Sequence, residues 1–232
     1  MSPEEFIKDV REDDINIMHH CIVENKYEAL GMLTALPYFR QVVNDNGNEA
    51  GWTPLLTACA NETGKANLDM VKLLVYNGAD LFAAKTDDGI SAAHLASTNG
   101  DLLLLDYILT YEPSELETRK PVHMKDINGS TPSHYAGSVG KFDVLNLLIE
   151  HGAKLEEINN FKLSVFDCAV SSDDSDLLTA LWPYAKKYKR DMDEVSNLFI
   201  PLNFCFFTQA ESFGFLHIAS GIPSSRTLKF LL

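Results

Sequence analysis

Four histidines are the side chains best suited to chemistry in this sequence, because neutral imidazoles are frequent metal ligands. They are His19, His94, His134 and His217. Successive copies lie 75, 40 and 83 residues apart, each within its own copy of a repeated segment. Residues placed in this way do not converge on one ion. We therefore expect structural histidines, with no bound metal and no cofactor.

Other patterns associated with catalysis are weak or missing. Asp173-Asp174-Ser175-Asp176 is acidic enough for a cation site, but it lacks the glycine and the distal glutamate of an EF-hand loop. We interpret it as the N-cap of a helix that contains Leu177. No phosphate-binding glycine loop and no Gly-x-Ser-x-Gly elbow occurs. We predict that the chain is not an enzyme. The alternative, a cleft using Asp167, Cys168 or His217, has no nucleophile, base and oxyanion donor in one place.

Charge and hydropathy exclude further classes of partner. The chain has 33 acidic and 19 basic residues, for a formal net charge of −14. This balance argues against nucleic acid, which requires a basic footprint, and against anionic lipid. The longest apolar stretch, 198–207, is interrupted by Pro201 and Asn203 and is too short to span a bilayer. We expect it to pack as an irregular insertion; a protein-binding groove or a self-association surface is the alternative.

Cysteine usage indicates a reducing compartment. The four cysteines, at 21, 59, 168 and 205, form no Cys-x-x-Cys pair and no disulfide framework. The first residues, Met1-Ser-Pro-Glu-Glu5, are acidic and contain no apolar core typical of a signal peptide. We therefore expect buried, reduced thiols in a cytoplasmic protein, with the nucleus as the alternative location.

One phrase recurs along the chain. It reads Gly-Trp-Thr-Pro-Leu-Leu-Thr-Ala at 51–58, Gly-Ile-Ser-Ala-Ala-His-Leu-Ala at 89–96 and Gly-Ser-Thr-Pro-Ser-His-Tyr-Ala at 129–136. A leucine-rich helical segment follows each phrase. Two of these segments end in Asn-Gly-Ala-Asp (77–80) and His-Gly-Ala-Lys (151–154).

Each position of the phrase has a mechanical role. The glycines supply the positive φ of a hairpin turn, and the hydroxyl two residues later can cap the next helix, where proline suits the first turn. Small residues allow one helix to approach the next, and paired leucines form the inward stripe of the second helix. These residues are Ala58, Ala96, Ala136 and Ala169, and the pairs Leu73-Leu74, Leu104-Leu105, Leu147-Leu148 and Leu177-Leu178.

The phrase and its period resemble those of the ankyrin repeat. The resemblance implies an all-α solenoid in which helix-turn-helix pairs are linked by β-hairpin loops, with about five to six repeats, some of them degenerate. It also implies that the recurring histidine forms hydrogen bonds at the junction of hairpin and helix. Leu56 and Asp167 replace that histidine in two copies, where we expect looser junctions.

The resemblance covers roughly residues 13–232 and is strongest from 51 to 158. We expect residues 1–12 to form an N-terminal capping helix and residues 13–232 to form the repeat array. The expected repeats are 13–47, 48–84, 86–125, 126–158, 159–190 and 212–232, with an insertion at 191–211.

A stacked array of this kind predicts a protein–protein interaction module that binds on the concave face of hairpins and first helices. We expect the partner to be another protein and expect no small-molecule substrate; the acidic pair Asp87-Asp88 favours a partner with a basic surface. Trp52 either anchors a partner or packs against the preceding hairpin. By resemblance, the partner-binding positions are Glu49, Trp52, Asn61, Asp87, Asp88, Ile90, Thr98, Asn99, Ile127, Asn128, Ser130, Ser138 and Val139.

An alternative function follows from the last residues, Leu231-Leu232, which stop within a predicted helix. A regulatory or targeting domain at the N-terminus of a larger protein, for example a palmitoyltransferase or a channel, would continue beyond this point.

Overall fold

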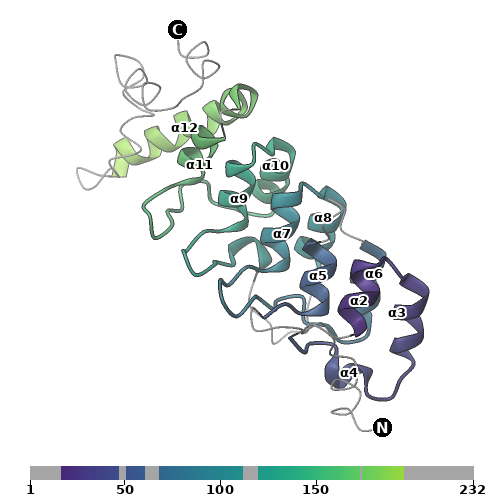
Figure 1. Cartoon of the computed structure of the whole chain (residues 1–232). Helices are drawn as coiled ribbons and strands as arrows, with labels where there is room; N and C mark the ends of the chain where they lie inside the picture. Colours follow the sequence, from purple (N-terminus) through teal and green to yellow (C-terminus); the bar gives the residue numbers. More distant parts are fainter. Residues whose placement is uncertain (1–16, 47–50, 61–67, 112–119, 173, 196–232) are drawn as a thin grey trace. The chain divides into compact units, whose positions relative to one another are not determined.

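Helices are the main secondary structure of the described residues. The computed structural model describes residues 17–46, 51–60, 68–111, 120–172 and 174–195, with side chains of the last helix up to 185. Within these ranges there are eleven α-helices, one 3-10 helix and no strand beyond an isolated bridge. The predicted all-α fold is confirmed (Figure 1). The chain divides into a first unit, 1–127, and a second unit, 128–232.

The first unit contains three helix pairs and two shorter elements. The pairs are α2 (Ile17–Val23) with α3 (Tyr27–Thr34), α5 (Pro54–Ala60) with α6 (Leu68–Tyr76), and α7 (Ala92–Asn99) with α8 (Leu102–Thr110); the shorter elements are α4 (Phe39–Val42) and η1 (Pro121–His123). Helix α5 packs between α2 and α7, so consecutive first helices lie side by side. Ala58 and Ala96 are fully buried in this stack, as the small-residue pattern predicts.

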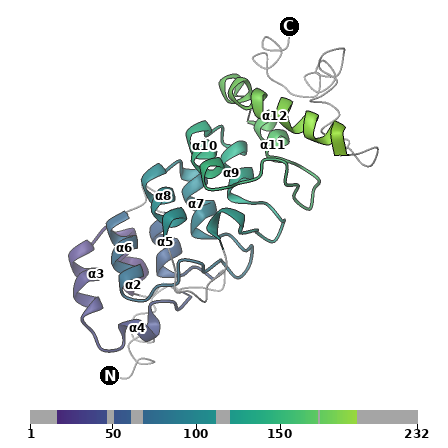
Figure 2. The same cartoon turned by 180° about the vertical axis from the view of Figure 1, so that it is seen from behind.

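The second unit contains two helix pairs. They are α9 (Pro132–Ser138) with α10 (Phe142–Glu150), and α11 (Val165–Ser171) with α12 (Ser175–Val195). The first helices α9 and α11 pack on each other. A Cβ on Gly137 would lie 3.0 Å from the carbonyl oxygen of Val165, which shows how closely the two backbones approach. Figure 2 shows the helices of each unit from the opposite side.

Capping residues fix where the helices begin. Thr53 Oγ1 accepts the Leu56 N–H at 3.2 Å at the start of α5, and Asp101 accepts the Leu104 N–H at 3.0 Å at the start of α8. Asp174 accepts the N–H groups of Asp176 and Leu177 at 2.9 and 3.0 Å. Asp174, within the predicted acidic cluster, therefore caps the helix that contains Leu177, as we predicted.

The turn glycines have the conformation expected of them. Gly51, Gly89 and Gly129 have φ values of 79°, 76° and 73°, in the left-handed region that glycine adopts without strain. Gly78 and Gly152, just after α6 and α10, have φ values of 98° and 91°.

The predicted core is confirmed with one refinement. Leu74, Leu104, Leu105, Leu148, Leu177 and Leu178 are buried. Leu73 and Leu147, each the first member of its pair, are only half-buried. In α6 and α10 the second leucine of the pair is buried, and the first, about 100° away around the helix, lies at the edge of the buried stripe.

Two described thiols are buried and one is half-buried, and none of the three is in a disulfide. Burial raises the pKa of Cys59, to which the charge of Asp101 adds, and Cys21 also has a raised pKa through burial. Burial and then the charge of Asp167 raise the pKa of Cys168 to about 11. Such a thiol is protonated at neutral pH and is a poor nucleophile.

Several expectations concern residues outside the described ranges. These are the capping helix at 1–12, the last repeat at 212–232, the apolar stretch 198–207, and the residues His217 and Cys205. Helix α12 extends to Val195, five residues into the expected insertion at 191–211. None of the helices in the described residues combines the length and the apolar character that crossing a membrane requires.

Candidate functional site

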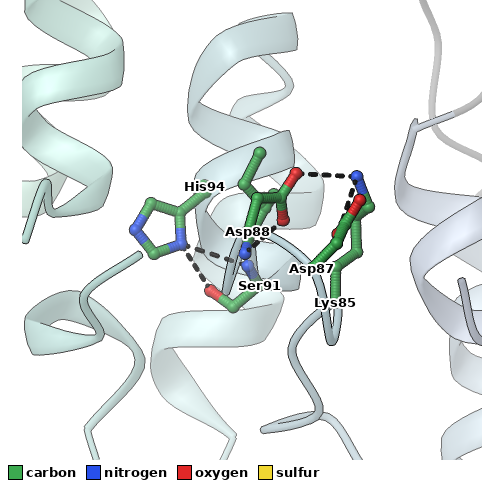
Figure 3. A network of polar contacts seen from close by, with 6 residues as sticks. Lys85, Asp87, Asp88, Ser91 and His94 are labelled. Carbon is green, nitrogen blue, oxygen red and sulfur yellow. Dashed lines mark hydrogen bonds and ion pairs between the residues drawn. The ribbon is translucent and has the colours of Figure 1, made fainter. Parts of the chain in front are cut away.

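The loop between α6 and α7 forms a compact hairpin at residues 84–91, which we call the Asp88 finger. Ala84 and Ser91 form an antiparallel bridge, and the Lys85 N–H donates to the Ile90 carbonyl at 2.9 Å. Asp88 Oδ1 accepts the Ile90 N–H at 2.9 Å. The finger is therefore held by its own backbone and by the carboxylate of Asp88 (Figure 3).

Lys85 lies at the centre of a charged cluster in this finger. Its Nζ lies 2.7 Å from Asp88 Oδ2 and 3.5 Å from Asp87 Oδ1. The same Nζ lies 4.7 Å from the centroid of the Trp52 ring, within cation–π range. Only 10% of the Lys85 side chain is exposed, against 32% for Asp88 and 47% for Asp87.

The pKa values of the pair reflect these contacts. Burial alone would raise the pKa of Asp88, but the hydrogen bonds from Lys85 and Ile90 outweigh burial and hold it below its usual value. Burial alone would lower the pKa of Lys85, but Asp88 and then Asp87 outweigh it and raise the pKa. Both groups are therefore charged at neutral pH.

Trp52 is part of this cluster, and its contact differs from the predicted packing against the preceding hairpin. The side chain is half-buried, with the Lys85 ammonium over its ring. A Cβ on the preceding Gly51 would clash with Thr86, so this backbone lies directly against the Asp88 finger. Trp52 thus packs on the hairpin that follows it in sequence, because the ammonium of Lys85 lies over its ring.

The recurring histidines form hydrogen bonds at the junction between hairpin and helix. His94 Nδ1 accepts the Ser91 N–H at 3.2 Å, and His134 Nδ1 accepts the Thr131 N–H at 3.1 Å. His134 Nε2 lies 3.1 Å from the carbonyl oxygen of Leu163, in the next loop of the second unit. The expected structural role of these two histidines is confirmed.

His19 has the same type of contact in the first copy. Its Nε2 lies 2.9 Å from the carbonyl oxygen of Trp52. Burial lowers the pKa of His19, and the hydrogen bond to Trp52 opposes this only in part. The imidazole is therefore neutral in the folded protein at pH 7. In the described part of the chain, no three His, Cys, Asp or Glu side chains gather in a metal-binding arrangement.

The expectation of a looser junction at Asp167 is wrong. Asp167 Oδ2 accepts both the N–H and the Oγ–H of Ser164 at 2.7 Å, and Ser164 Oγ accepts the Asp167 N–H at 3.4 Å. A carboxylate at this position completes the same reciprocal cap that histidine forms in α7 and α9, because both side chains place an acceptor within hydrogen-bond distance of the N-cap N–H. Leu56 has no such acceptor, so only the Thr53 half of the cap is present there.

Consecutive loops are joined by a hydrogen bond within each unit. In the first unit, the Ile127 N–H donates to the Asp88 carbonyl at 2.7 Å. In the second unit, the Asn160 N–H donates to the Asn128 carbonyl at 2.8 Å. Each loop thereby orients the next, and Ile127 is left with 65% of its side chain exposed.

The other predicted partner contacts differ in what their side chains can offer. Thr98, Asn128, Ser138 and Val139 are exposed, and Ile90 is half-buried. Asn99 donates to the carbonyl of Cys59 at 3.0 Å, which joins α7 to α5. Ser130 is 8% exposed and its Oγ accepts from Asn159 Nδ2 at 3.1 Å, so burial argues against a partner contact there. Glu49 and Asn61 lie outside the described residues.

The loop between α10 and α11 contains an exposed aromatic residue that the resemblance does not select. We call residues 158–164 the Phe161 finger. Phe161 is 65% exposed, and Lys162 has a φ of 64° where the other copies have glycine. Buried Asn159 uses Oδ1 to accept the N–H groups of Phe161 and Leu163 at 3.0 and 3.1 Å. The positive φ was not predictable from residue type, but the exposed phenylalanine was visible in the sequence.

Comparison with known families and proteins agrees with this geometry. The family model described as ankyrin repeats (3 copies) matches residues 64–159. A putative ankyrin repeat protein of Rickettsia bellii (strain RML369-C) is 29% identical over 96 residues, 40% of this chain. Ankyrin repeat domain-containing protein 37 of Mus musculus is 31% identical over 103 residues, 44% of this chain.

A third relative, delta-latroinsectotoxin-Lt1a of Latrodectus tredecimguttatus, is 33% identical over 100 residues, 43% of this chain. The three alignments span 14%, 60% and 8% of the Rickettsia, mouse and Latrodectus proteins. In each case the similarity is therefore to part of a longer sequence.

Proposed function

We propose that the protein is a non-catalytic module that binds another protein through its hairpin loops and first helices; the match of the family model for ankyrin repeats to residues 64–159 supports this proposal. Ankyrin repeats in general are protein–protein interaction modules, and the family is generally non-catalytic. The observation that carries the proposal is the contrast between fixed backbone and exposed side chains at the loop tips.

In the first unit, this contrast is clearest at Asp87 and Ile127. Both side chains are about half exposed or more, at 47% and 65%. Both lie on backbone that hydrogen bonds hold in place, through the bridge at Ala84 and Ser91 and through the Ile127–Asp88 bond. Preordered groups lose little conformational entropy on binding, so these tips can contribute efficiently to affinity.

The electrostatics favour a partner with a basic surface. The net charge of −14 attracts a cationic partner over distance and raises its association rate. Asp87 is the more exposed carboxylate of the Asp88 finger, whereas Asp88 is engaged with Lys85 and Ile90. We therefore assign the partner-directed charge of this finger to Asp87.

The test uses a partner recovered with the tagged full chain and then purified separately. Asp87→Lys should slow its association about threefold or more at low ionic strength and lose this effect in high salt. Asp106→Lys, at an exposed position of α8, changes the net charge equally and serves as the matched control. Equal association rates for wild type, Asp87→Lys and Asp106→Lys would remove Asp87 from the interface.

Two related expectations stay predictions. One is that these repeats form a regulatory or targeting part of a larger protein. The other is that the protein works in the cytoplasm, as a scaffold. A transcript that continues the reading frame would decide the first, and localisation of the endogenous protein would decide the second.

A further inference from the structure

Asparagine followed by glycine occurs four times in this chain, at 46–47, 77–78, 99–100 and 128–129. This dipeptide can react with itself, because the glycine nitrogen can attack the preceding side-chain amide and glycine has no Cβ to obstruct the approach. The last three pairs lie within the described ranges. They differ in whether hydrogen bonds hold the attacking nitrogen and the amide that it would attack.

In two of these pairs, hydrogen bonds hold both groups. The half-buried Asn77 donates through Nδ2 to a carbonyl of α6 at 2.8 Å, and the Gly78 N–H donates to another carbonyl of α6 at 3.0 Å. The half-buried Asn99 donates through Nδ2 to the Cys59 carbonyl at 3.0 Å, and the Gly100 N–H donates to a carbonyl of α7 at 3.0 Å. Reaction at either pair therefore requires two hydrogen bonds to break first.

At Asn128–Gly129, neither group is held. Asn128 is exposed in the loop that leads into α9, and among the described residues neither its side-chain amide nor the Gly129 N–H takes part in a hydrogen bond. The equivalent N–H groups of two other loops, those of Gly89 and Lys162, are each bonded within their own loop at 3.0 Å. The unbonded nitrogen is therefore specific to this loop.

A neighbouring hydrogen bond also favours attack by this nitrogen. The Asn160 N–H donates to the Asn128 carbonyl oxygen at 2.8 Å. That oxygen belongs to the same peptide group as the Gly129 nitrogen, so negative charge develops on it when the nitrogen loses its proton. A donor that is already in place stabilises this anion, which is the species that attacks.

We propose that Asn128–Gly129 is a self-modifying site, at which the asparagine loses its side-chain nitrogen. The deprotonated Gly129 nitrogen attacks Asn128 Cγ, the C–N bond of the side-chain amide breaks, and ammonia leaves with the proton as a succinimide ring closes. Water then opens the ring. Attack of water at Cγ gives aspartate, and attack at the backbone carbonyl carbon gives isoaspartate. In sum, one water is consumed and one ammonia is released.

The two products have different consequences for the loop. Aspartate fits, because Asp88 occupies the equivalent position and its carbonyl accepts the Ile127 N–H as that of Asn128 accepts the Asn160 N–H. Isoaspartate routes the backbone through Cβ and Cγ and displaces the carbonyl that Asn160 binds. Either product adds a negative charge at an exposed position, so the site changes the surface of the protein as it ages. This inference goes beyond the proposed interaction function and does not depend on it.

The test incubates the full chain, folded and in urea, and follows each asparagine by peptide mass spectrometry. In the folded chain, Asn128 should react at least about tenfold faster than Asn77 and Asn99, because hydrogen bonds hold those two pairs. In urea the three should react at similar rates, because glycine follows each of them. The rate at Asn128 should rise with pH, because the deprotonated nitrogen attacks.

Asn128→Gln is the matched control, because its longer side chain forms the corresponding ring much more slowly. This variant should lose the reaction at position 128 and keep the wild-type rates at Asn77 and Asn99. Isoaspartate in the aged chain, detected with an isoaspartyl methyltransferase, should accompany faster hydrogen exchange of the Asn160 amide. Equal rates at the three asparagines in the folded chain, or reaction of Asn128 in urea only, would overturn the inference. Both measurements use the chain without a partner, so their failure would leave the interaction function untouched.

Discussion

The Asp88 finger of the first unit and the Phe161 finger of the second share a hairpin plan but use their tips differently. In the former, Lys85 lies over the Trp52 ring and pairs most closely with Asp88, so one of the two acidic charges is neutralised within the finger and the more exposed Asp87 retains the other. In the latter, buried Asn159 makes the side-chain hydrogen bond to the backbone, and the tip exposes Phe161. The number of charged residues in a loop therefore does not show which loop has side chains available for a partner, because a carboxylate such as that of Asp88 can be paired within its own loop.

The comparison depends most on Asn159. Asn159→Ala leaves two N–H groups without their acceptor and should lower the free energy of unfolding by about 3 kcal/mol. Asn159→Asp keeps the acceptors and should cost little, as the equivalent position of the preceding repeat holds buried Asp126. Urea denaturation gives the values, and hydrogen exchange at 160–163 locates the effect. Equal stability of the alanine and aspartate variants would show that Asn159 does not hold the finger.

The turn residue gives the next largest effect. Gly89→Ala places a Cβ 3.1 Å from the Ile127 nitrogen and 3.2 Å from Asp126 Cα, at a φ of 76°. The strain and the crowding together should destabilise the protein by about 2 kcal/mol. Thermal denaturation measures this, and Gly31→Ala, with no heavy atom within 4 Å of the added Cβ, provides a control. A neutral Gly89→Ala would mean that the Asp88 finger is not tightly held.

Lys85→Met tests the internal neutralisation. Losing the ion pair and the cation–π contact should cost about 1 kcal/mol at pH 7. The pKa of Asp88 is lowered in the folded state, so its contribution is present above its ordinary pKa and lost as pH falls through the folded value. The raised pKa of Lys85 confines its contribution to pH values below the folded pKa, and it disappears as pH rises through that value. Denaturation at pH 3 and pH 7 should therefore show a smaller deficit for Lys85→Met in acid; an equal deficit would contradict the pairing.

The smallest expected change is in the free energy of unfolding when Lys162, at the tip of the Phe161 finger, is replaced. Lys162→Gly removes a left-handed side chain but adds freedom to the unfolded chain, for a net gain of roughly 0.5–1 kcal/mol. Lys162→Ala keeps the positive φ without the ammonium and should gain nothing. Calorimetry of the two variants makes the comparison, and a loss of stability in Lys162→Gly would show that the lysine supports the fold itself.

Much of the fold was predictable because the repeated phrase encodes local geometry. Positive φ at Gly51, Gly89 and Gly129, caps at Thr53 and Asp174, and buried alanines on first helices all follow from residue type. Short α4, over Phe39–Val42, was not predicted, because its four residues carry no repeat signal.

The site was less predictable, for a physical reason. The resemblance to a repeat indicates which backbone positions face outward. It does not indicate which of their side chains are already bound by neighbouring residues. Lys85, three residues before Asp88, could have suggested the ion pair, whereas its contact with Trp52 joins residues 33 apart in sequence. Asp167 was misjudged because its capping role depends on the acceptor it offers, which histidine and aspartate share.

Each unit contains a described thiol whose rate of modification can report on local opening. Cys59 lies on α5 of the first unit and Cys168 on α11 of the second, both with pKa values that burial raises. An alkylating reagent reaches fully buried Cys59 only when α5 leaves its neighbours, whereas half-buried Cys168 requires a smaller movement, so the modification rate of each cysteine records local opening of its own unit. Two native residues thus make it possible to follow the opening of each unit without any engineered label.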